Sequence, residues 1–353
     1  MGKTRGKRLA ALLPNEQGGQ ARGCTETMKK RNTAEEYVEG LKSGELRALG
    51  RALSLLESMR DDDRRLAAEI LRFAGREPDF CVGLTGAPGA GKSTLIEAAG
   101  LRFVASGRRL AVLAVDPSGV RTGGSVLGDK TRMNALAAHP SAFIRPSPSG
   151  GIAGGLNVAT DAAVLLCAGA GYAHVCIETV GVGQSEIDVF DVADALVLVI
   201  QPGAGDELQG LKRGIVEMAD LVVVNKADGE RRRAALQTVR DYQAALSLFP
   251  ARADRWDVPV LAVSAVESEG LDAVFEQLAT FKHLRQMSGE WEKRRAEGRL
   301  KRFRESALAV IKRRWLAQNP TDDLDARVFD GRLPAYAAAV EYEARLFAHR
   351  HER

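Results

Sequence analysis

Six short apolar runs, each separated from the next by a stretch long enough for a helix, constrain the fold of this chain most strongly. Runs without polar alternation are typical of strands buried on both faces, as in a parallel sheet. The intervening stretches suit right-handed crossover connections. We therefore predict an α/β fold, a mostly parallel sheet covered by helices, over residues 78–283. In chain order the runs are FCVGLTG, LAVLAVD, HVCIETVG, ALVLVIQ, LVVVNKAD and VPVLAVSA.

Helical patterns flank this region on both sides. Apolar residues recur at spacings of three and four from 33 to 76, which predicts an N-terminal helical extension over 29–77, with Asp61–Asp63 as a break and N-cap. Residues 284–353 are helical and charged. One stretch there has an apolar stripe opposite a face crowded with Arg and Lys. We interpret that basic face as solvated, because glutamates are interleaved; nucleic-acid binding is the disfavoured alternative.

Composition limits the remaining classes. A net charge of +4, from 50 basic and 46 acidic side chains, gives little support for a polyanionic partner. The chain has no run of 18 apolar residues, so we expect no membrane span. The basic, Gly-rich residues 1–28 are expected to be a disordered tail, with a targeting segment as the alternative. Scattered cysteines without metal-ligand spacing predict buried thiols and a cytoplasmic protein.

A complete phosphate-binding motif lies between the first run and a helical stretch. The segment GAPGAGKS fits G-x-x-x-x-G-K-[ST]. Its glycines let backbone N–H groups turn toward an anion, and the following helix adds its positive end. Lys92 is expected to reach the β- and γ-phosphates, and the Ser93 hydroxyl to bind Mg²⁺. The predicted nucleotide contacts here are Gly86, Ala87, Pro88, Gly89, Ala90, Gly91, Lys92, Ser93 and Thr94.

A second motif predicts which base is bound. Asn225, Lys226 and Asp228 form N-K-x-D after an apolar run. A carboxylate at Asp228 can accept hydrogen bonds from N1–H and N2–H₂ of guanine, whereas adenine offers no such pair of donors on that edge. One run later come Ser264 and Ala265, where a backbone N–H could meet guanine O6. The sequence therefore predicts GTP and GDP as ligands.

The segments between these motifs contain candidate sensors of the γ-phosphate. Glu178 and Gly181 stand where GTPases usually have D-x-x-G, so we expect the carboxylate near Mg²⁺ and the glycine amide near the γ-phosphate. Asp116, at the end of an apolar run, and Asp129, in a Gly-rich segment, are further candidate Mg²⁺ ligands. Val182 follows Gly181 where Ras-like enzymes have a water-orienting Gln. We therefore expect slow intrinsic hydrolysis.

Several longer motifs resemble the MeaB / MMAA / ArgK family of P-loop GTPases, of the SIMIBI type. They are GAPGAGKST, VDPSGVRTGGSVLGDKTRM, FIRPSPSGG, ETVGVGQSE, PGAGDELQGLKRGI and NKAD. The resemblance spans about residues 40–280. It implies a homodimeric GTPase chaperone of an adenosylcobalamin-dependent acyl-CoA mutase, typically methylmalonyl-CoA mutase, which gates cofactor loading and protects the mutase from inactivation. It also implies phosphate and Mg²⁺ roles for Lys92, Ser93, Asp116, Asp129 and Glu178.

Residues outside the core motifs also receive roles from the resemblance. Asp206, Glu207 and Lys212 resemble part of a mobile loop that answers the mutase, and 284–353 resembles a dimerisation region. We expect Lys92, Asp129, Glu178 and Gly181 to serve the hydrolysis, with Gln184 a possible substitute for the missing Gln. Two alternatives stay open: a protein kinase or phosphotransferase of the ArgK type, and a nucleotide-binding module without turnover.

Overall fold

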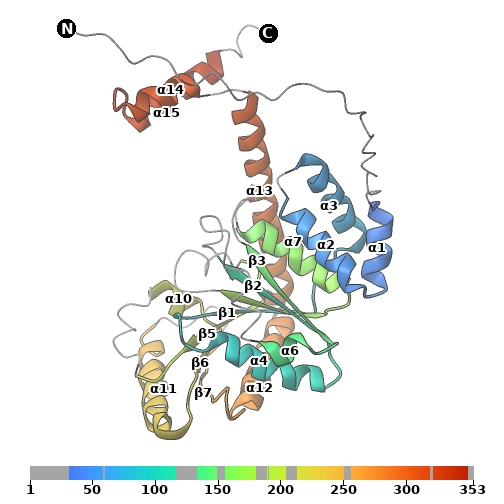
Figure 1. The fold of residues 1–353 in the computed structure, drawn as a ribbon. Helices are drawn as coiled ribbons and strands as arrows, with labels where there is room; N and C mark the ends of the chain where they lie inside the picture. The colour runs from blue at the N-terminus through green and yellow to red at the C-terminus, as the bar shows by residue number, and fades with distance from the viewer. Residues whose placement is uncertain are drawn as a thin grey trace, which may run out of the picture. The chain divides into compact units, whose positions relative to one another are not determined.

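A parallel sheet organises the computed structural model, which describes residues 32–58, 60–116, 133–148, 156–179, 189, 191–203, 213–249, 256–318 and 321–348. Within these residues the sheet has seven strands in the order β3-β2-β4-β1-β5-β6-β7, and every neighbouring pair is parallel (Figure 1). The predicted α/β fold is confirmed. The strands are β1 (Phe80–Thr85), β2 (Leu110–Asp116), β3 (Ala142–Pro148), β4 (His174–Thr179), β5 (Ala195–Ile200), β6 (Leu221–Val224) and β7 (Val260–Ala262).

Strand β3 was absent from the six predicted runs. Its sequence is AFIRPSP, and it lies at an end of the strand order, paired only with β2 in the described sheet. Proline cannot donate to a strand ladder, so Pro146 and Pro148 are tolerated where one side of the strand has no neighbour. The prolines that make this strand hard to recognise in the sequence therefore agree with its edge position.

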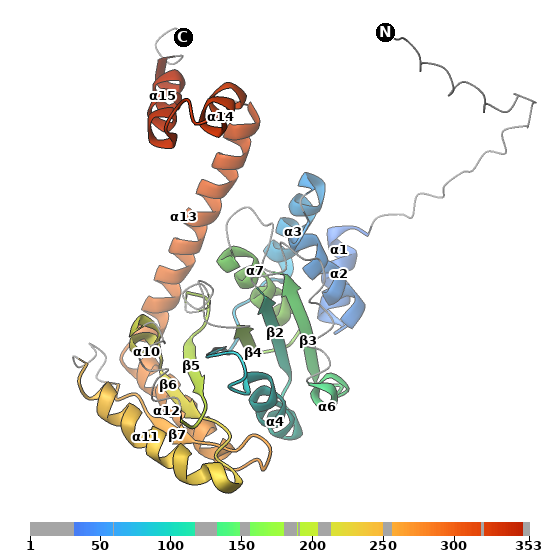
Figure 2. The ribbon, with the colours of Figure 1, turned by 60° about the vertical axis from the view of Figure 1, so that its left-hand side comes forward.

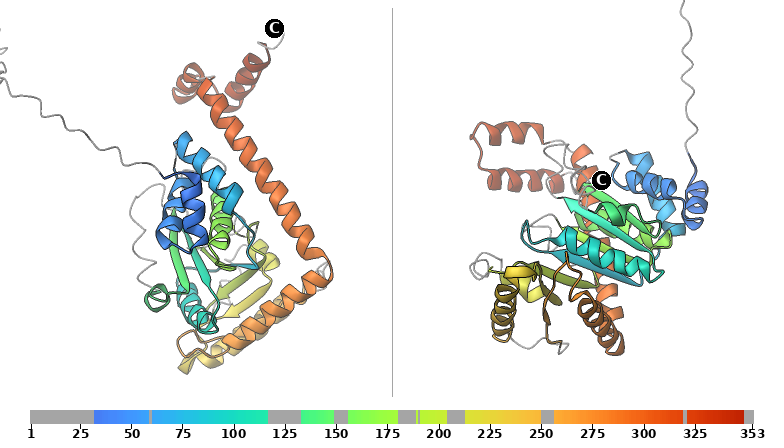
Figure 3. Two further views of the ribbon diagram at one scale, coloured as in Figure 1. Left: turned by 90° about the vertical axis from the view of Figure 1, so that its right-hand side faces the viewer. Right: turned by 60° about the horizontal axis from the view of Figure 1, so that its bottom comes forward.

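Side chains that alternate along the strands pack against two different sets of helices, one on each face of the sheet. Val197, Val199 and Val223 pack with α4 and α12, whereas Leu196 and Leu198 point to the opposite face. Figures 2 and 3 show α4 and the N-terminal helices on opposite sides of the sheet. One face carries α1 (Ala34–Lys42), α2 (Leu46–Leu56), α3 (Asp61–Ala74), α7 (Leu156–Gly169), α10 (Arg213–Met218) and α11 (Arg232–Leu246); the other carries α4 (Lys92–Ala105), α6 (Asn134–Ala137) and α12 (Leu271–Met287).

The N-terminal helices begin with different caps. Thr33 closes a capping box on α1, because its hydroxyl accepts from the Glu36 amide at 3.3 Å and the Glu36 carboxylate accepts from the Thr33 amide at 3.1 Å. A break between two helices does occur here, because α2 ends at Leu56 and α3 begins at Asp61, but it precedes the aspartates and the N-cap prediction is wrong. They form the first turn of α3, after Arg60 as N-cap, where their charge favours the positive helix end.

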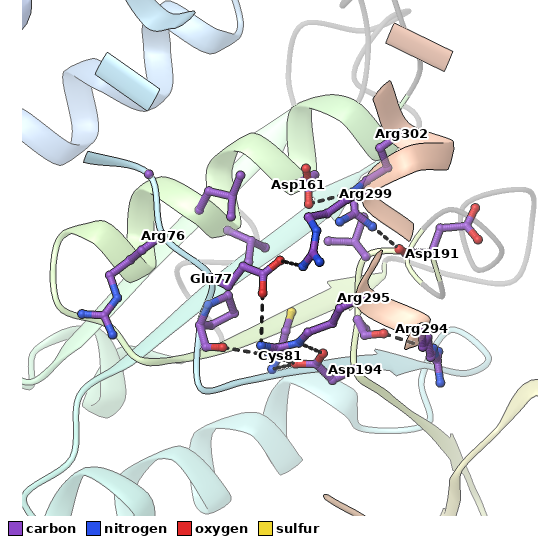
Figure 4. Close-up of a pocket in the computed structure, with 16 residues that line it drawn as sticks. Arg76, Glu77, Cys81, Asp161, Asp191, Asp194, Arg294, Arg295, Arg299 and Arg302 are labelled. Carbon is purple, nitrogen blue, oxygen red and sulfur yellow. Dashed lines mark hydrogen bonds and ion pairs between the residues drawn. The ribbon is translucent and has the colours of Figure 1, made fainter. Parts of the chain in front are cut away.

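The C-terminal region is helical, as predicted, and the arginines of its first long helix form ion pairs with acidic residues of the α/β region. It contains α13 (Glu290–Gln318), α14 (Asp322–Phe329) and α15 (Ala335–Ala348). Arg295 of α13 donates to both carboxylate oxygens of Asp194 at 2.7 Å and to the Pro78 carbonyl at 2.9 Å (Figure 4). Arg302 forms an ion pair with Asp161 of α7, with Nε and Oδ1 2.9 Å apart. Part of the basic face that we expected to be solvated therefore packs against α7 and the residues that precede β1 and β5.

Removing Arg295 should destabilise the protein considerably. Asp194 is 8 % exposed, and its carboxylate accepts from Arg295 and from the Cys81 amide, the latter at 2.8 Å. Arg295→Ala removes the first of these two donors and leaves the buried carboxylate with the second. Breaking a buried ion pair in this way costs about 3 kcal/mol of unfolding free energy. Arg299→Ala is the control, because its half-exposed pair with Glu77 should contribute less than about 1 kcal/mol. Urea unfolding measures both; equal losses would contradict this interpretation.

Three cysteines are free and buried, in agreement with the prediction of buried thiols. Burial raises the pKa of Cys167 to about 12, and it also raises the pKa of Cys81 and Cys176. Because thiolates are the reactive form, Cys81, Cys167 and Cys176 should resist alkylation at pH 8 in the folded protein. A Cys24→Ser variant removes the cysteine outside the described residues. Mass spectrometry should find three alkylated cysteines after unfolding in urea; fast labelling without urea would refute the burial.

A candidate nucleotide-binding site

The phosphate-binding motif forms a tight turn between β1 and the first turn of α4. Gly91 precedes the helix with φ 88°, a left-handed conformation that favours glycine, and a Cβ there would lie 2.5 Å from Nδ2 of Asn225. At Gly86 a Cβ would lie 2.0 Å from the Val199 carbonyl oxygen. The loop backbone therefore approaches β5 and the segment after β6 closely. A side chain at Gly86 or Gly91 would prevent this approach.

Lys92 begins α4 and turns back over the loop. Its side chain is buried, and Nζ donates to the carbonyl oxygens of Gly86 at 2.7 Å and Ala87 at 3.1 Å. These bonds hold the ammonium against the loop backbone, and Lys92 itself stands at the positive, amino-terminal end of α4. The position suits a cation that contacts phosphate oxygens, as the motif predicts.

Ser93 and Glu178 bring two hard oxygen ligands together from segments far apart in the chain. The Ser93 hydroxyl donates to Oε1 of Glu178 at 2.6 Å, and both side chains are buried. Glu178 reaches this point because β4 lies between β1 and β2, where its register partners are Leu84 and Ala114. Hydroxyl and carboxylate oxygens are the ligand types that Mg²⁺ takes. The donors present therefore fit a Mg²⁺ ion.

Other predicted metal and switch residues are placed only in part. Asp116 is the last residue of β2, the strand next to β4, so its backbone lies at the same carboxyl-terminal edge as Glu178. Ligands of parallel sheets bind at this edge. Asp129, Gly181 and Gln184 lie outside the residues that the structure describes, as do Asp206, Glu207 and Lys212. Their predicted roles stay predictions.

Asn225 connects the phosphate loop to the segment that follows β7. Its Nδ2 donates to the carbonyl oxygens of Ala90 and Gly91 at 3.1 and 3.2 Å, and its Oδ1 accepts from the Ala265 amide at 3.2 Å. The side chain is 1 % exposed. Asn225 therefore acts in this structure as a fixed brace between the two ends of the site. The Ala265 N–H, which we expected near guanine O6, is donated here to this brace.

Asp228 is held in place by the fully buried Ser264. The Ser264 hydroxyl donates to Oδ2 of Asp228 at 2.8 Å and accepts from the Glu267 amide at 3.1 Å. Lys226, with φ 60°, extends its Nζ to Oε1 of Gln201 at 3.1 Å. The sequence analysis did not identify Gln201, although its position directly after the β5 run was a usable signal. Nor did it assign the Ser264 side chain this positioning role.

Ser264→Ala should weaken guanine binding without abolishing it. The change removes one hydrogen bond to a charged group, so the Asp228 carboxylate loses its fixed orientation. We expect GDP affinity to fall about tenfold, the equivalent of a single such bond. Ser288→Ala, which removes an exposed hydroxyl bonded to the Arg285 carbonyl, is the matched control. Calorimetric titration with GDP measures both variants, and an unchanged affinity for Ser264→Ala would rule out this positioning role.

The fold and the site together define a P-loop nucleoside triphosphatase with the sequence motif of a guanine site. Residues 49–319 match the family model described as methylmalonyl-CoA mutase-associated GTPase MeaB. The chain belongs to this MeaB family of GTPases. The expected resemblance to the MeaB / MMAA / ArgK family is therefore confirmed.

Individual relatives agree with this assignment. A probable GTPase of Mycobacterium tuberculosis is 44% identical over 316 residues, which cover 87% of this chain and 94% of the relative. The mouse mitochondrial methylmalonic aciduria type A homolog is also 44% identical, over 74% of this chain and 66% of its own length. A solved structure described as a LAO/AO transport system kinase is 30% identical, with a TM-score of 0.69, and covers 89% of this chain and 97% of its own.

Proposed function

We propose that this GTPase is a switch that assists an adenosylcobalamin-dependent acyl-CoA mutase, methylmalonyl-CoA mutase or a relative. The match to a family described as mutase-associated GTPases carries this proposal. In it, the GTP and GDP states differ in how they bind the mutase, gate its cofactor loading and protect it from inactivation. A nucleotide can bias such an interface only if its two forms differ in affinity for the two states.

The chemistry that we propose is attack of water on the γ-phosphate of GTP. Lys92 and the amides of the phosphate loop stabilise the charge that grows on the phosphate oxygens in the transition state. Ser93 and Glu178 would hold Mg²⁺, with Asp116 and Asp129 as further candidate ligands, and the ion would supply additional positive charge there. Asn225, Lys226, Asp228 and the 264–265 segment bind the guanosine end. Intrinsic turnover is slow in this proposal, because no Gln follows Gly181.

The C-terminal helices support a further part of the proposal, a homodimer. On α13, Leu300, Phe303, Val310 and Ile311 recur at helical spacing and are exposed, and Tyr336 of α15 is 84 % exposed. An apolar stripe of this kind favours association with another surface. A second copy of the chain is the occupant that we propose. Light scattering would detect the dimer, and a monomeric wild-type protein would refute it.

We place the protein in the cytoplasm, where its buried thiols would stay reduced. None of the helices that the structure describes has the length and apolar character needed to cross a membrane.

The decisive experiment measures GTP hydrolysis by the protein alone and with the mutase added, with ATP as the nucleotide control. We expect slow turnover alone, a preference for GTP, and acceleration by the mutase. A pull-down of the mutase with GDP and with a non-hydrolysable GTP analogue should give unequal binding. Absent binding in both states would refute the mutase proposal. Stable transfer of label from GTP to a protein would instead favour the phosphotransferase alternative.

A further inference from the structure

A cavity of about 520 Å³ lies between α4, α12 and the sheet, and none of the predicted nucleotide contacts lines it. Its walls come from alternate residues of β1, namely Phe80, Val82 and Leu84, and from the facing sides of the two helices. The other apolar lining residues include Leu95, Ile96, Ala99, Val197, Val274, Phe275 and Leu278. The chamber is large enough to hold an organic ligand, and its walls are predominantly apolar, as in many small-molecule sites.

The polar end of this chamber is cationic. Arg108, His174 and Lys282 all line it. The pKa of His174 is lowered, mainly by burial and further by the positive charges of Arg108 and Lys282. Asp79, an exposed residue, acts on the same histidine in the opposite direction. Among the described residues, no carboxylate forms an ion pair with Arg108 or Lys282. Arg108 lies over the ring of Phe103 at 5.4 Å, and Lys282 lies over the rings of Phe80 at 5.6 Å and Trp291 at 5.7 Å.

The cationic end and the apolar part of the cavity lie one after the other along the direction of the strands. His174 and Phe80 are register partners at the amino-terminal edge of the sheet, where Leu110 also pairs with His174. Leu84 lies toward the other end of β1, and Leu95 lies in the first turn of α4, near the phosphate loop. The cavity therefore has a cationic end at the amino-terminal edge of the sheet and an apolar part that extends toward the opposite edge.

We propose that this cavity binds an unbranched aliphatic chain with an anionic head group, a carboxylate or a phosphate. The head meets Arg108 and Lys282 at the amino-terminal edge of the sheet, and the chain lies between α4 and α12 with its far end near Leu84. Charge complementarity selects the anionic head, because in the described structure neither cation has a carboxylate partner and both lie over aromatic rings. The apolar walls select the chain, because its transfer from water is favourable in proportion to the area buried.

The test is calorimetric titration of the full-length protein with hexanoate, octanoate and decanoate, below their micelle concentrations. Each added methylene should increase the affinity about fourfold until the chamber is full. Decyl phosphate in place of decanoate distinguishes the two anionic heads, and decylammonium provides the opposite charge. We expect saturable binding of at least one anionic decyl ligand, and weaker binding of decylammonium.

Two variants separate a ligand site from a packing feature. The double variant Arg108→Glu/Lys282→Glu should reverse the preference, so that decylammonium binds better than decanoate and decyl phosphate. Ala99→Phe fills the chamber and should abolish binding of all three. Lys293→Glu, on the exposed side of α13, is the charge control, and thermal unfolding verifies that each variant is folded. The proposal is refuted if neither anionic decyl ligand binds saturably. It is equally refuted if the charge reversal leaves the preference unchanged in a folded protein.

Discussion

Lys92→Ala should reduce kcat for GTP hydrolysis by about a thousandfold. The Lys92 ammonium is bonded to the Gly86 and Ala87 carbonyls, and no other residue of the loop carries a positive charge. Loss of one preorganised charge in a buried site costs two to three orders of magnitude in rate, roughly the effect of removing an oxyanion-hole donor. Single-turnover hydrolysis at saturating GTP isolates the chemical step from nucleotide binding.

Two comparisons make this result interpretable. Lys293→Ala removes a lysine whose pair with Glu290 is exposed, so its rate should equal that of the wild-type protein. Thermal unfolding of Lys92→Ala reports whether loss of the two loop bonds also loosens α4. A folded Lys92→Ala protein that hydrolyses GTP at the wild-type rate would contradict the proposed site.

Asp228→Asn should change which base the protein prefers. In the proposed site the wild-type carboxylate accepts from both donors on the guanine edge, whereas an amide can accept from N1–H but presents N–H₂ to the guanine amino group. Xanthine carries a carbonyl oxygen at that position, which the amide can satisfy. A site built for defined hydrogen bonds discriminates against the wrong partner by about 10⁴, so the ratio of GTP to xanthosine triphosphate affinities should shift by roughly that factor.

Competition of the two nucleotides against a fluorescent GDP measures this ratio directly. Glu267→Gln is a suitable control, because it changes an exposed carboxylate in the same turn. A preference for GTP that survives in Asp228→Asn would mean that another residue reads the base. Loss of binding for both nucleotides, with the fold retained, would mean that Asp228 positions the turn and does not select the base.

The sequence predicted the parts of the site that are local in the chain. The glycines and Lys92 of the phosphate loop act within eight residues of one another, so their spacing alone defines their arrangement. The Ser93–Glu178 and Asn225–Ala90 contacts join residues 85 and 135 positions apart. Such pairs depend on the strand order, which apolar runs do not specify. For this reason Asn225 appeared in the sequence only as part of a base-reading motif, and its bracing contacts emerged from the fold.

The basic face of α13 illustrates a different limit. Arg294, Arg295 and Arg302 follow a helical spacing that is equally compatible with solvent or with a partner surface. Their partners, among them Asp161 and Asp194, lie more than 100 positions away in the chain. Nothing local in the sequence connects the two sets. Strand β3 was missed for a related reason. Its prolines are tolerated because only β2 pairs with it in the described sheet, and the strand order that leaves its other side without a neighbour cannot be read from the sequence.

The arginines of α13 also affect where an independently folding GTPase domain could end. The boundary that we expected from the sequence, at residue 283, precedes every arginine that reaches Asp194 or Asp220. Asp220 has a side chain only 1 % exposed and lies 4.0 Å from Arg285 and 3.8 Å from Arg294. A fragment truncated at 283 would keep two buried carboxylates and lose their countercharges. Autonomous folding should therefore require the chain to continue at least through Arg295, inside the predicted dimerisation region.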